Sequence, residues 1–242
     1  MPNAQFLTEY INMNIASSVR SPNSVGEKYK IIREELPKNV RAIAVSKTVG
    51  VEAIRAAYAA GARDFAENRI QEAIAKQEQL QDLSDICWHF IGHLQGNKAK
   101  KTVENFDWIH TCDSLKLGQR IANLAADLPS PPQVCLQVKI LPDPNKHGWT
   151  VPELMEALPE LSSYEKLHIR GLMTMLPLGL SETEMLAAFQ ATRELGDRIA
   201  EQNYSNIQMR EFSMGMSGDY QLAVQAGSTM VRLGQIIFGA RS

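Results

Sequence analysis

Lys47 follows a short apolar run and is the side chain best placed to form a covalent bond with a ligand. The run Arg41-Ala-Ile-Ala-Val-Ser-Lys47 has the composition of a buried strand, and helix-forming residues begin within a few positions. A lysine that such a strand delivers to the rim of a sheet is partly desolvated, which lowers the pKa of an amine and makes it nucleophilic. The chemistry predicted for this position is Schiff-base formation with a carbonyl ligand.

Two glycine-rich segments late in the chain have the composition of a phosphate site. One is Ser213-Met-Gly-Met-Ser217-Gly-Asp219, and the other is Arg232-Leu-Gly234-Gln235. Both offer sterically open backbone N–H groups, and the first also offers hydroxyls, which are donors that a phosphate uses. A plain connecting loop is the alternative for the first segment taken alone, because short glycine motifs often occur by chance.

Apolar or β-branched runs alternate with helix-like segments along the chain. The runs lie near residues 41–47, 62–66, 87–91, 107–111, 133–140, 167–173, 207–213 and 229–234. Helices are predicted at Val51–Ala60, Arg69–Leu83, Ser114–Leu128, Pro152–Leu161, Ser181–Gln202 and Gly218–Ala226. This alternation predicts a single α/β domain over residues 1–242, a (β/α)8 TIM-type barrel preceded by helix over about residues 5–18 and 26–36. A doubly wound open sheet is the alternative, but no G-x-G-x-x-G follows the first run.

The barrel places the chemically useful residues together. In this fold the active face lies at the carboxyl ends of the strands, and phosphates often bind in the loops after strands 7 and 8. Both glycine-rich segments follow those two strands, and closure of the barrel brings strand 8 beside strand 1. We therefore expect Lys47 to lie next to the phosphate site.

Polar residues also end the second and third strands. Glu67 could serve as a general base, although a helix cap or an ion pair is the more ordinary role for a carboxylate at this position. The histidines His89, His93 and His110 lack the close spacing of a zinc site and no cysteine accompanies them, so no metal is predicted.

Composition excludes several classes of function. A net charge of −2 provides no electrostatic basis for binding nucleic acid or an anionic membrane. No window of about 20 apolar residues is present to span a bilayer. The N-terminus lacks the basic and apolar regions of a signal peptide, and the three cysteines are predicted to be buried thiols, so we expect a cytoplasmic protein.

Six separated motifs resemble those of the pyridoxal phosphate homeostasis protein family, and the resemblance extends from about residue 10 to the end of the chain. They are Ala44-Val45-Ser46-Lys47, Phe65-Ala66-Glu67-Asn68, Trp88–Lys98, Gly171-Leu172-Met173-Thr174-Met175, Ser213–Asp219, and Val231-Arg232-Leu233-Gly234 with Phe238-Gly239. The resemblance implies the barrel of the alanine racemase N-terminal domain and binding of pyridoxal 5′-phosphate (PLP). It also implies a role in the balance of vitamin B6 and amino acids, with no established catalysis.

The resemblance also assigns roles to individual residues. Lys47 would form the internal aldimine with PLP, and Arg232 would face the nitrogen of the pyridine ring. The turn from Ser213 to Ser217, which includes Met214, would hold the phosphate together with the backbone of Gly234 and Gln235. Thr229 would add a hydroxyl, and Asn68 and His93 would line the ring and the mouth of the site.

Two features favour a carrier over an enzyme. An arginine beside the ring nitrogen keeps that nitrogen unprotonated, and an unprotonated ring is a poor electron sink. The chain also stops at Ser242, so the second racemase domain with its tyrosine base is expected to be absent, and Tyr220 has no evident role as a base. We therefore expect a monomer that holds PLP and passes it to apo PLP-dependent enzymes. A racemase-type amino-acid enzyme and a Schiff-base aldolase are the alternatives.

Overall fold

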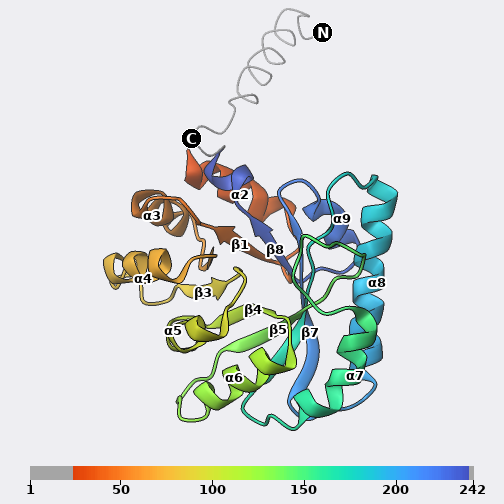
Figure 1. Ribbon diagram of the computed structural model, residues 1–242. Helices are drawn as coiled ribbons and strands as arrows, with labels where there is room; N and C mark the ends of the chain where they lie inside the picture. Colours follow the sequence, from red (N-terminus) through yellow and green to blue (C-terminus); the bar gives the residue numbers. More distant parts are fainter. Residues whose placement is uncertain (1–23, 240–242) are drawn as a thin grey trace, which may run out of the picture.

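The computed structural model describes residues 24–239, and within that range the sheet is a closed barrel (Figure 1). Its eight strands pair in parallel in chain order, and the last returns to pair with the first. The strands are β1 (Arg41–Val45), β2 (Asp64–Glu67), β3 (Cys87–Phe90), β4 (Trp108–Cys112), β5 (Gln133–Gln137), β6 (His168–Met173), β7 (Ile207–Met216) and β8 (Met230–Leu233). The predicted TIM-type barrel is confirmed.

Helices connect the strands and surround the barrel (Figure 1). They are α2 (Val25–Glu35), α3 (Val51–Ala59), α4 (Ile70–Gln79), the 3₁₀ turn η1 (Gly96–Lys98) leading into α5 (Ala99–Asn105), α6 (Leu115–Ala125), α7 (Val151–Ser162), α8 (Glu182–Ala200), α9 (Tyr220–Gln225) and α10 (Gln235–Phe238). Ser181 begins α8 with a capping box, because its hydroxyl accepts from the backbone N–H of Glu184 and the Glu184 carboxylate accepts from the backbone N–H of Ser181. The helix predicted near residues 5–18 lies outside the described range.

The carboxyl ends of two strands differ from the sequence prediction in a way that matters for the site. β1 ends at Val45, so Lys47 lies in the turn after the strand. β7 continues to Met216, three residues further than predicted, and its pairing with β8 shifts register between Ser213 and Met216. Part of the segment predicted to be a phosphate loop is therefore strand.

Side chains alternate between two cores along each strand, as the period of a β-strand requires. On β1, Ile43 and Val45 belong to a small apolar cluster with Trp108 and Met173, whereas Ala42 and Ala44 belong to the larger cluster shared with the helices. The first cluster lies inside the barrel and the second between the sheet and its helices. This alternation determines which side chains of a strand can reach the barrel interior.

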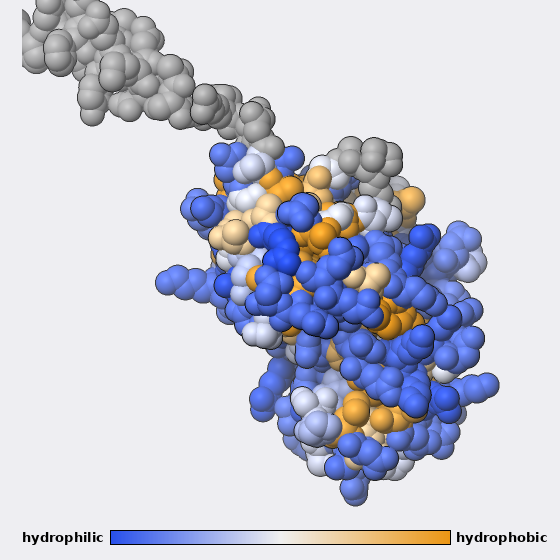
Figure 2. Space-filling model, turned by 90° about the vertical axis from the view of Figure 1, so that its left-hand side faces the viewer, coloured by the Kyte–Doolittle hydropathy of each residue, from blue (hydrophilic) through white to orange (hydrophobic). Residues whose placement is uncertain are grey.

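The outside of the barrel is largely polar. Figure 2 shows the side that carries α3 and α4, where hydrophilic residues cover most of the surface and apolar residues form only small patches. Within residues 24–239, no helix combines the length and apolar character needed to cross a bilayer. Of the three cysteines predicted to be buried, Cys112 and Cys135 are buried and Cys87 is partly exposed. Burial raises the pKa of the Cys87 and Cys112 thiols to about 12, so both stay protonated at neutral pH.

Gly171 is a point where the sheet leaves no room for a side chain. A Cβ atom there would lie 1.6 Å from the carbonyl oxygen of Glu211 on the neighbouring strand. Gly171→Ala should lower the free energy of unfolding by about 1–3 kcal/mol, the usual cost of overpacking, as measured by denaturant titration. Gly96→Ala is the control, since its Cβ would meet nothing within 4 Å. An equal effect of both substitutions would contradict this account.

Candidate functional site

A cavity of about 470 Å³ lies at the carboxyl ends of the strands and contains Lys47. Seven of the ten predicted site residues line it: Lys47, Asn68, His93, Ser217, Arg232, Gly234 and Gln235. They come from the ends of β1, β2, β3, β7 and β8, which are far apart in the sequence. The structure thus brings most of the predicted site together at the face where this fold carries its ligands.

The turn that carries Lys47 is held from both sides by the side chains of α4. Thr48 has a positive φ of 64°, an uncommon conformation for a β-branched residue, and its backbone N–H donates to Glu72 at 2.6 Å. On the other side of Lys47, the carbonyl of Ser46 accepts from the Lys76 amine at 2.8 Å. The backbone around Lys47 is therefore fixed by side chains and does not depend on Lys47 itself.

Glu67 forms a buried ion pair with Lys76, as the sequence allowed, and caps no helix. Its Oε1 atom accepts from the Lys76 amine at 2.7 Å and from the Ser46 hydroxyl at 2.7 Å. Burial raises the pKa of Glu67, and the hydrogen bonds from Lys76 and Ser46 oppose that shift. Glu67 is absent from the walls of the cavity, so its contacts indicate a structural role beneath Lys47.

Arg232 supplies a buried positive charge to the same cavity. Only 4% of the residue is exposed, and its guanidinium donates to the Ser213 hydroxyl at 2.7 Å and to the Thr174 carbonyl at 2.8 Å. Burial lowers the pKa of Arg232 to about 10, which still leaves it a cation at neutral pH. Among residues 24–239, no carboxylate lies within ion-pair distance of Arg232, although Asp219 contributes to its electrostatic environment. A ligand with an acceptor atom fits this side of the cavity.

Residues of both glycine-rich segments line the cavity. The backbone N–H of Ile236 donates to the Ser217 hydroxyl at 3.5 Å, which joins the loop after β7 to the first turn of α10. Gly215 has a φ of 95°, and a Cβ there would lie 2.6 Å from Ala223, so only glycine fits. A Cβ at Gly218 would meet nothing within 4 Å. The backbone of this loop is consequently open to close approach by an anion.

Three predicted site residues lie elsewhere. Ser213 and Met214 lie within the extended β7 strand, where the Ser213 hydroxyl contacts Arg232 and the Met214 side chain is fully buried in the larger core. Thr229 precedes β8 at the opposite end of that strand, and its hydroxyl donates to Glu211 at 2.6 Å and accepts from the backbone N–H of Phe212. None of the three lines the cavity, so the phosphate contacts expected of them are not supported by the structure.

Three residues that shape the site were given no role in the sequence prediction. Ile91 and Met175 line the cavity as apolar wall residues, and Lys76 holds the Lys47 turn from below. A lysine four residues after Glu72, on the same face of α4 as Ile70 and Ala73, was a detectable hint for the last of these.

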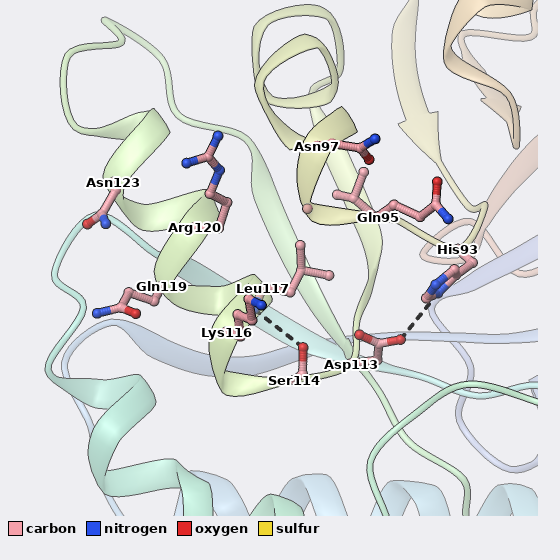
Figure 3. A pocket seen from close by; sticks show the side chains of 12 residues that line it. His93, Gln95, Asn97, Asp113, Ser114, Lys116, Leu117, Gln119, Arg120 and Asn123 are labelled. Carbon is pink, nitrogen blue, oxygen red and sulfur yellow. Dashed lines mark hydrogen bonds and ion pairs between the residues drawn. The ribbon is translucent and has the colours of Figure 1, made fainter.

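A second cavity of about 740 Å³ adjoins the first through His93 but does not include Lys47 (Figure 3). His93 reaches Asp113 at 3.4 Å and stacks on His147 with ring centroids 3.6 Å apart and planes 10° apart. Nitrogen lone pairs lie in the ring planes, so nearly parallel stacked rings do not aim them at one ion. These three residues are therefore a poor metal site in this arrangement.

Comparisons with known proteins agree with the geometry. The alanine racemase N-terminal domain family matches residues 21–242. A pyridoxal phosphate homeostasis protein of Synechocystis sp. is 51% identical over 213 residues, which are 88% of this chain and 97% of that protein. The corresponding protein of Escherichia coli is 38% identical over 208 residues, 85% of this chain and 87% of its own.

Solved structures show the same fold. PipY of Synechococcus elongatus with PLP bound superposes with a TM-score of 0.85 at 47% identity, covering 89% of this chain and 100% of PipY. An alanine racemase of Clostridium difficile shares the fold alone, with a TM-score of 0.73 at 17% identity over 90% of this chain and 57% of the racemase. With the family match, the relatives and the site in agreement, the chain belongs to the pyridoxal phosphate homeostasis protein family, which is built on the alanine racemase N-terminal domain.

Proposed function

We propose that this chain is a PLP carrier that holds the cofactor as a Schiff base on Lys47. One observation carries the proposal: Lys47, Arg232 and both glycine-rich loops line a single cavity. Its volume of about 470 Å³ is within the range of small-molecule sites. PLP bound to the related PipY supports the same ligand here.

The chain's own groups match three polar parts of PLP: the aldehyde, the ring nitrogen and the phosphate. The amine of Lys47 suits the aldehyde, and the buried guanidinium of Arg232 can donate to the ring nitrogen. The backbone of Gly218, Gly234 and Gln235 and the hydroxyl of Ser217 suit the phosphate. Asn68, His93 and the apolar side chains of Ile91 and Met175 would enclose the ring. When bound, PLP supplies an electrophilic carbonyl and a ring that can withdraw electrons.

Two features of the cavity, as residues 24–239 form it, favour a carrier over an efficient enzyme. Arg232 donates to the ring nitrogen without giving up its proton, which limits the electron demand of the ring. No tyrosine lines the cavity among the described residues, and the Tyr220 hydroxyl instead donates to Glu35 at 3.0 Å. We propose that the barrel works as a single PLP-binding domain, as a cytoplasmic monomer, and that it delivers PLP to apo enzymes. A racemase-type amino-acid enzyme and a Schiff-base aldolase are the alternatives.

Lys47→Ala should abolish covalent PLP without unfolding the protein, because the surrounding turn is held by Lys76 and Glu72. Incubation with PLP, reduction by borohydride and mass spectrometry should show one added group on Lys47 in the parent protein and none in the variant. Lys116→Ala, on the wall of the neighbouring cavity, is the matched control and should retain the added mass. Added mass on the Lys47→Ala variant would contradict the assignment of Lys47 as the residue that forms the Schiff base. If the protein does not become yellow when PLP is added, the Schiff-base aldolase alternative is favoured.

Arg232→Gln should weaken PLP retention by about tenfold or more, which is what loss of a hydrogen bond to a charged donor typically costs, and should shift the absorption of bound PLP. Arg232→Lys is the comparison, because it keeps the charge and loses the planar donor set. Circular dichroism checks that each variant is folded. Unchanged affinity and spectrum in a folded Arg232→Gln protein would contradict contact between Arg232 and the ring.

The carrier proposal predicts negligible turnover of amino acids. The PLP-loaded protein, incubated separately with L- and D-alanine, should leave the chirality of each unchanged by chiral chromatography. Racemisation that disappears in the Lys47→Ala variant would overturn the carrier proposal and establish the enzyme. Racemisation that persists in that variant would come from a contaminant or from free PLP.

A further inference from the structure

A continuous chain of hydrogen bonds crosses the barrel interior from Arg232 to Asp64. The Ser213 hydroxyl lies 2.7 Å from the Arg232 guanidinium and 2.7 Å from Nδ1 of His110. Nε2 of His110 lies 2.9 Å from Nδ1 of His89, and Nε2 of His89 lies 2.9 Å from Asp64. Ser213, His110 and His89 are fully buried, whereas the Asp64 side chain is 20% exposed at the start of β2.

The two ends of this chain determine its direction. Arg232 can only donate a hydrogen bond, and an ionised Asp64 can only accept one. His89 must therefore donate from Nε2 to Asp64, and its Nδ1 accepts from Nε2 of His110. Nδ1 of His110 then accepts from Ser213, whose oxygen accepts from Arg232. With both histidines neutral this is the only arrangement that satisfies every bond, and any other requires an additional proton on His89, His110 or Asp64.

The surroundings favour this neutral arrangement. Burial lowers the pKa of His89 and lowers that of His110 further. Burial alone would raise the pKa of Asp64, but the hydrogen bond from His89 and the nearby Arg41 outweigh it. The charged and titratable groups that act on His89 are Asp64, Arg41, Asp107 and His110, and those that act on His110 are His89, Arg41 and Arg232.

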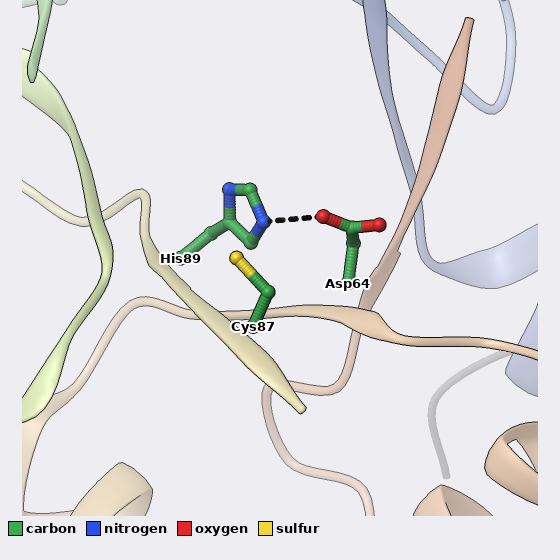
Figure 4. A group of neighbouring side chains, drawn as sticks. All are labelled: Asp64, Cys87 and His89. Atoms are coloured by element: carbon green, nitrogen blue, oxygen red, sulfur yellow. Dashed lines mark hydrogen bonds and ion pairs between the residues drawn. The ribbon is translucent and has the colours of Figure 1, made fainter. Parts of the chain in front are cut away.

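The exposed end of the chain is a compact polar group. Figure 4 shows His89 directed at Asp64 with Cys87 beside them. These three residues have the composition of a metal site, but Arg41 lies 3.8 Å from Asp64 and burial holds the Cys87 thiol protonated with a pKa of about 12. Asp64 therefore has an arginine as its charged partner, and its carboxylate remains available as the acceptor for His89.

We propose that Ser213, His110 and His89 are positioning residues that couple Asp64, at the amino-terminal face of the barrel, to Arg232 in the PLP cavity. This hydrogen-bond relay orients the Ser213 oxygen toward the guanidinium of Arg232. The Ser213 oxygen then holds the guanidinium where Arg232 can contact the cofactor ring. The coupling rests on the proposed function, because it assumes that Arg232 contacts the ring of bound PLP.

The relay can be tested in the protein without PLP. The chain contains five histidines, so the ring nitrogens of His89 and His110 can be assigned by long-range ¹H–¹⁵N spectra. At pH 7.5 both should carry hydrogen on Nε2. Asp64→Asn should shift the nitrogens of His110, and Ser213→Ala should shift those of His89, although neither variant touches the histidine it affects. Hydrogen on Nδ1 of His110, or the absence of both remote shifts, would overturn the relay.

Matched controls separate the relay from general effects. Asp85→Asn removes a carboxylate just before β3 that binds Tyr58 and Arg63, outside the relay. Ser228→Ala removes a buried hydroxyl that contacts only the carbonyls of Phe212, Met214 and Met230. Neither control should shift the His89 or His110 nitrogens, and shifts as large as those of the relay variants would contradict the proposal.

Coupling to the cavity is measured with pyridoxine 5′-phosphate, which has no aldehyde and cannot form a Schiff base. Ser213→Ala and Asp64→Asn should each weaken the binding of this probe, as measured by calorimetry. For Ser213→Ala we expect a loss of about fivefold in affinity, which is the lower end of typical coupling between sites. Asp64→Asn should have no further effect in the Ser213→Ala background, because the relay is already broken. Additive effects would overturn the coupling. Failure of the parent protein to bind this probe would instead count against the proposed function, while the histidine spectra still decide the relay.

Discussion

Closure of the barrel is the constraint on which the site depends. β1 pairs with β8 from Arg41 opposite Met230 to Ala44 opposite Leu233, so the chain leaves both strands side by side. Lys47 and Gly234 follow directly, and Arg232 lies one residue before the end of β8. An open sheet would leave the first and last strands apart and would separate the Lys47 amine from the loops proposed to bind phosphate. The parallel direction of all strands then places every loop that contributes to the cavity at one face.

Within the closed barrel, buried charged side chains keep the turn that carries Lys47 rigid. Lys76 bridges the Ser46 carbonyl, Glu67 and Glu72, and Glu72 holds the backbone of Thr48. Removing one partner of such a buried pair is costly, because it leaves the other charge without compensation. Lys47, the lysine proposed to react, therefore lies on a turn whose shape is determined by α4 and β2. The group bound to its amine can change while the turn keeps its conformation.

Arg232 illustrates how the interior of a small barrel can be polar without being a channel. The inward-facing positions near its guanidinium are filled by Ser213 and two histidines in hydrogen-bond contact, flanked by apolar residues such as Trp108 and Met173. Each polar group finds a partner, which is what a low-dielectric interior demands. The same chain that satisfies these groups also supplies the proposed link between the two faces of the barrel.

The sequence by itself determined the order of the eight strands and of most helices, the end of β1 near Lys47 and the placement of glycine-rich segments after β7 and β8. These features depend on hydrophobic period and turn chemistry, which near neighbours encode. The sequence did not predict α5 or α10. It could not determine that β7 extends to Met216, which keeps Ser213 out of the phosphate loop, or that Thr229 lies at the far end of β8. Nor could it reveal that His110 and Ser213, 103 residues apart, share a hydrogen bond. Those outcomes depend on strand register and on which face of a strand points inward, and both are decided only when all eight strands close together.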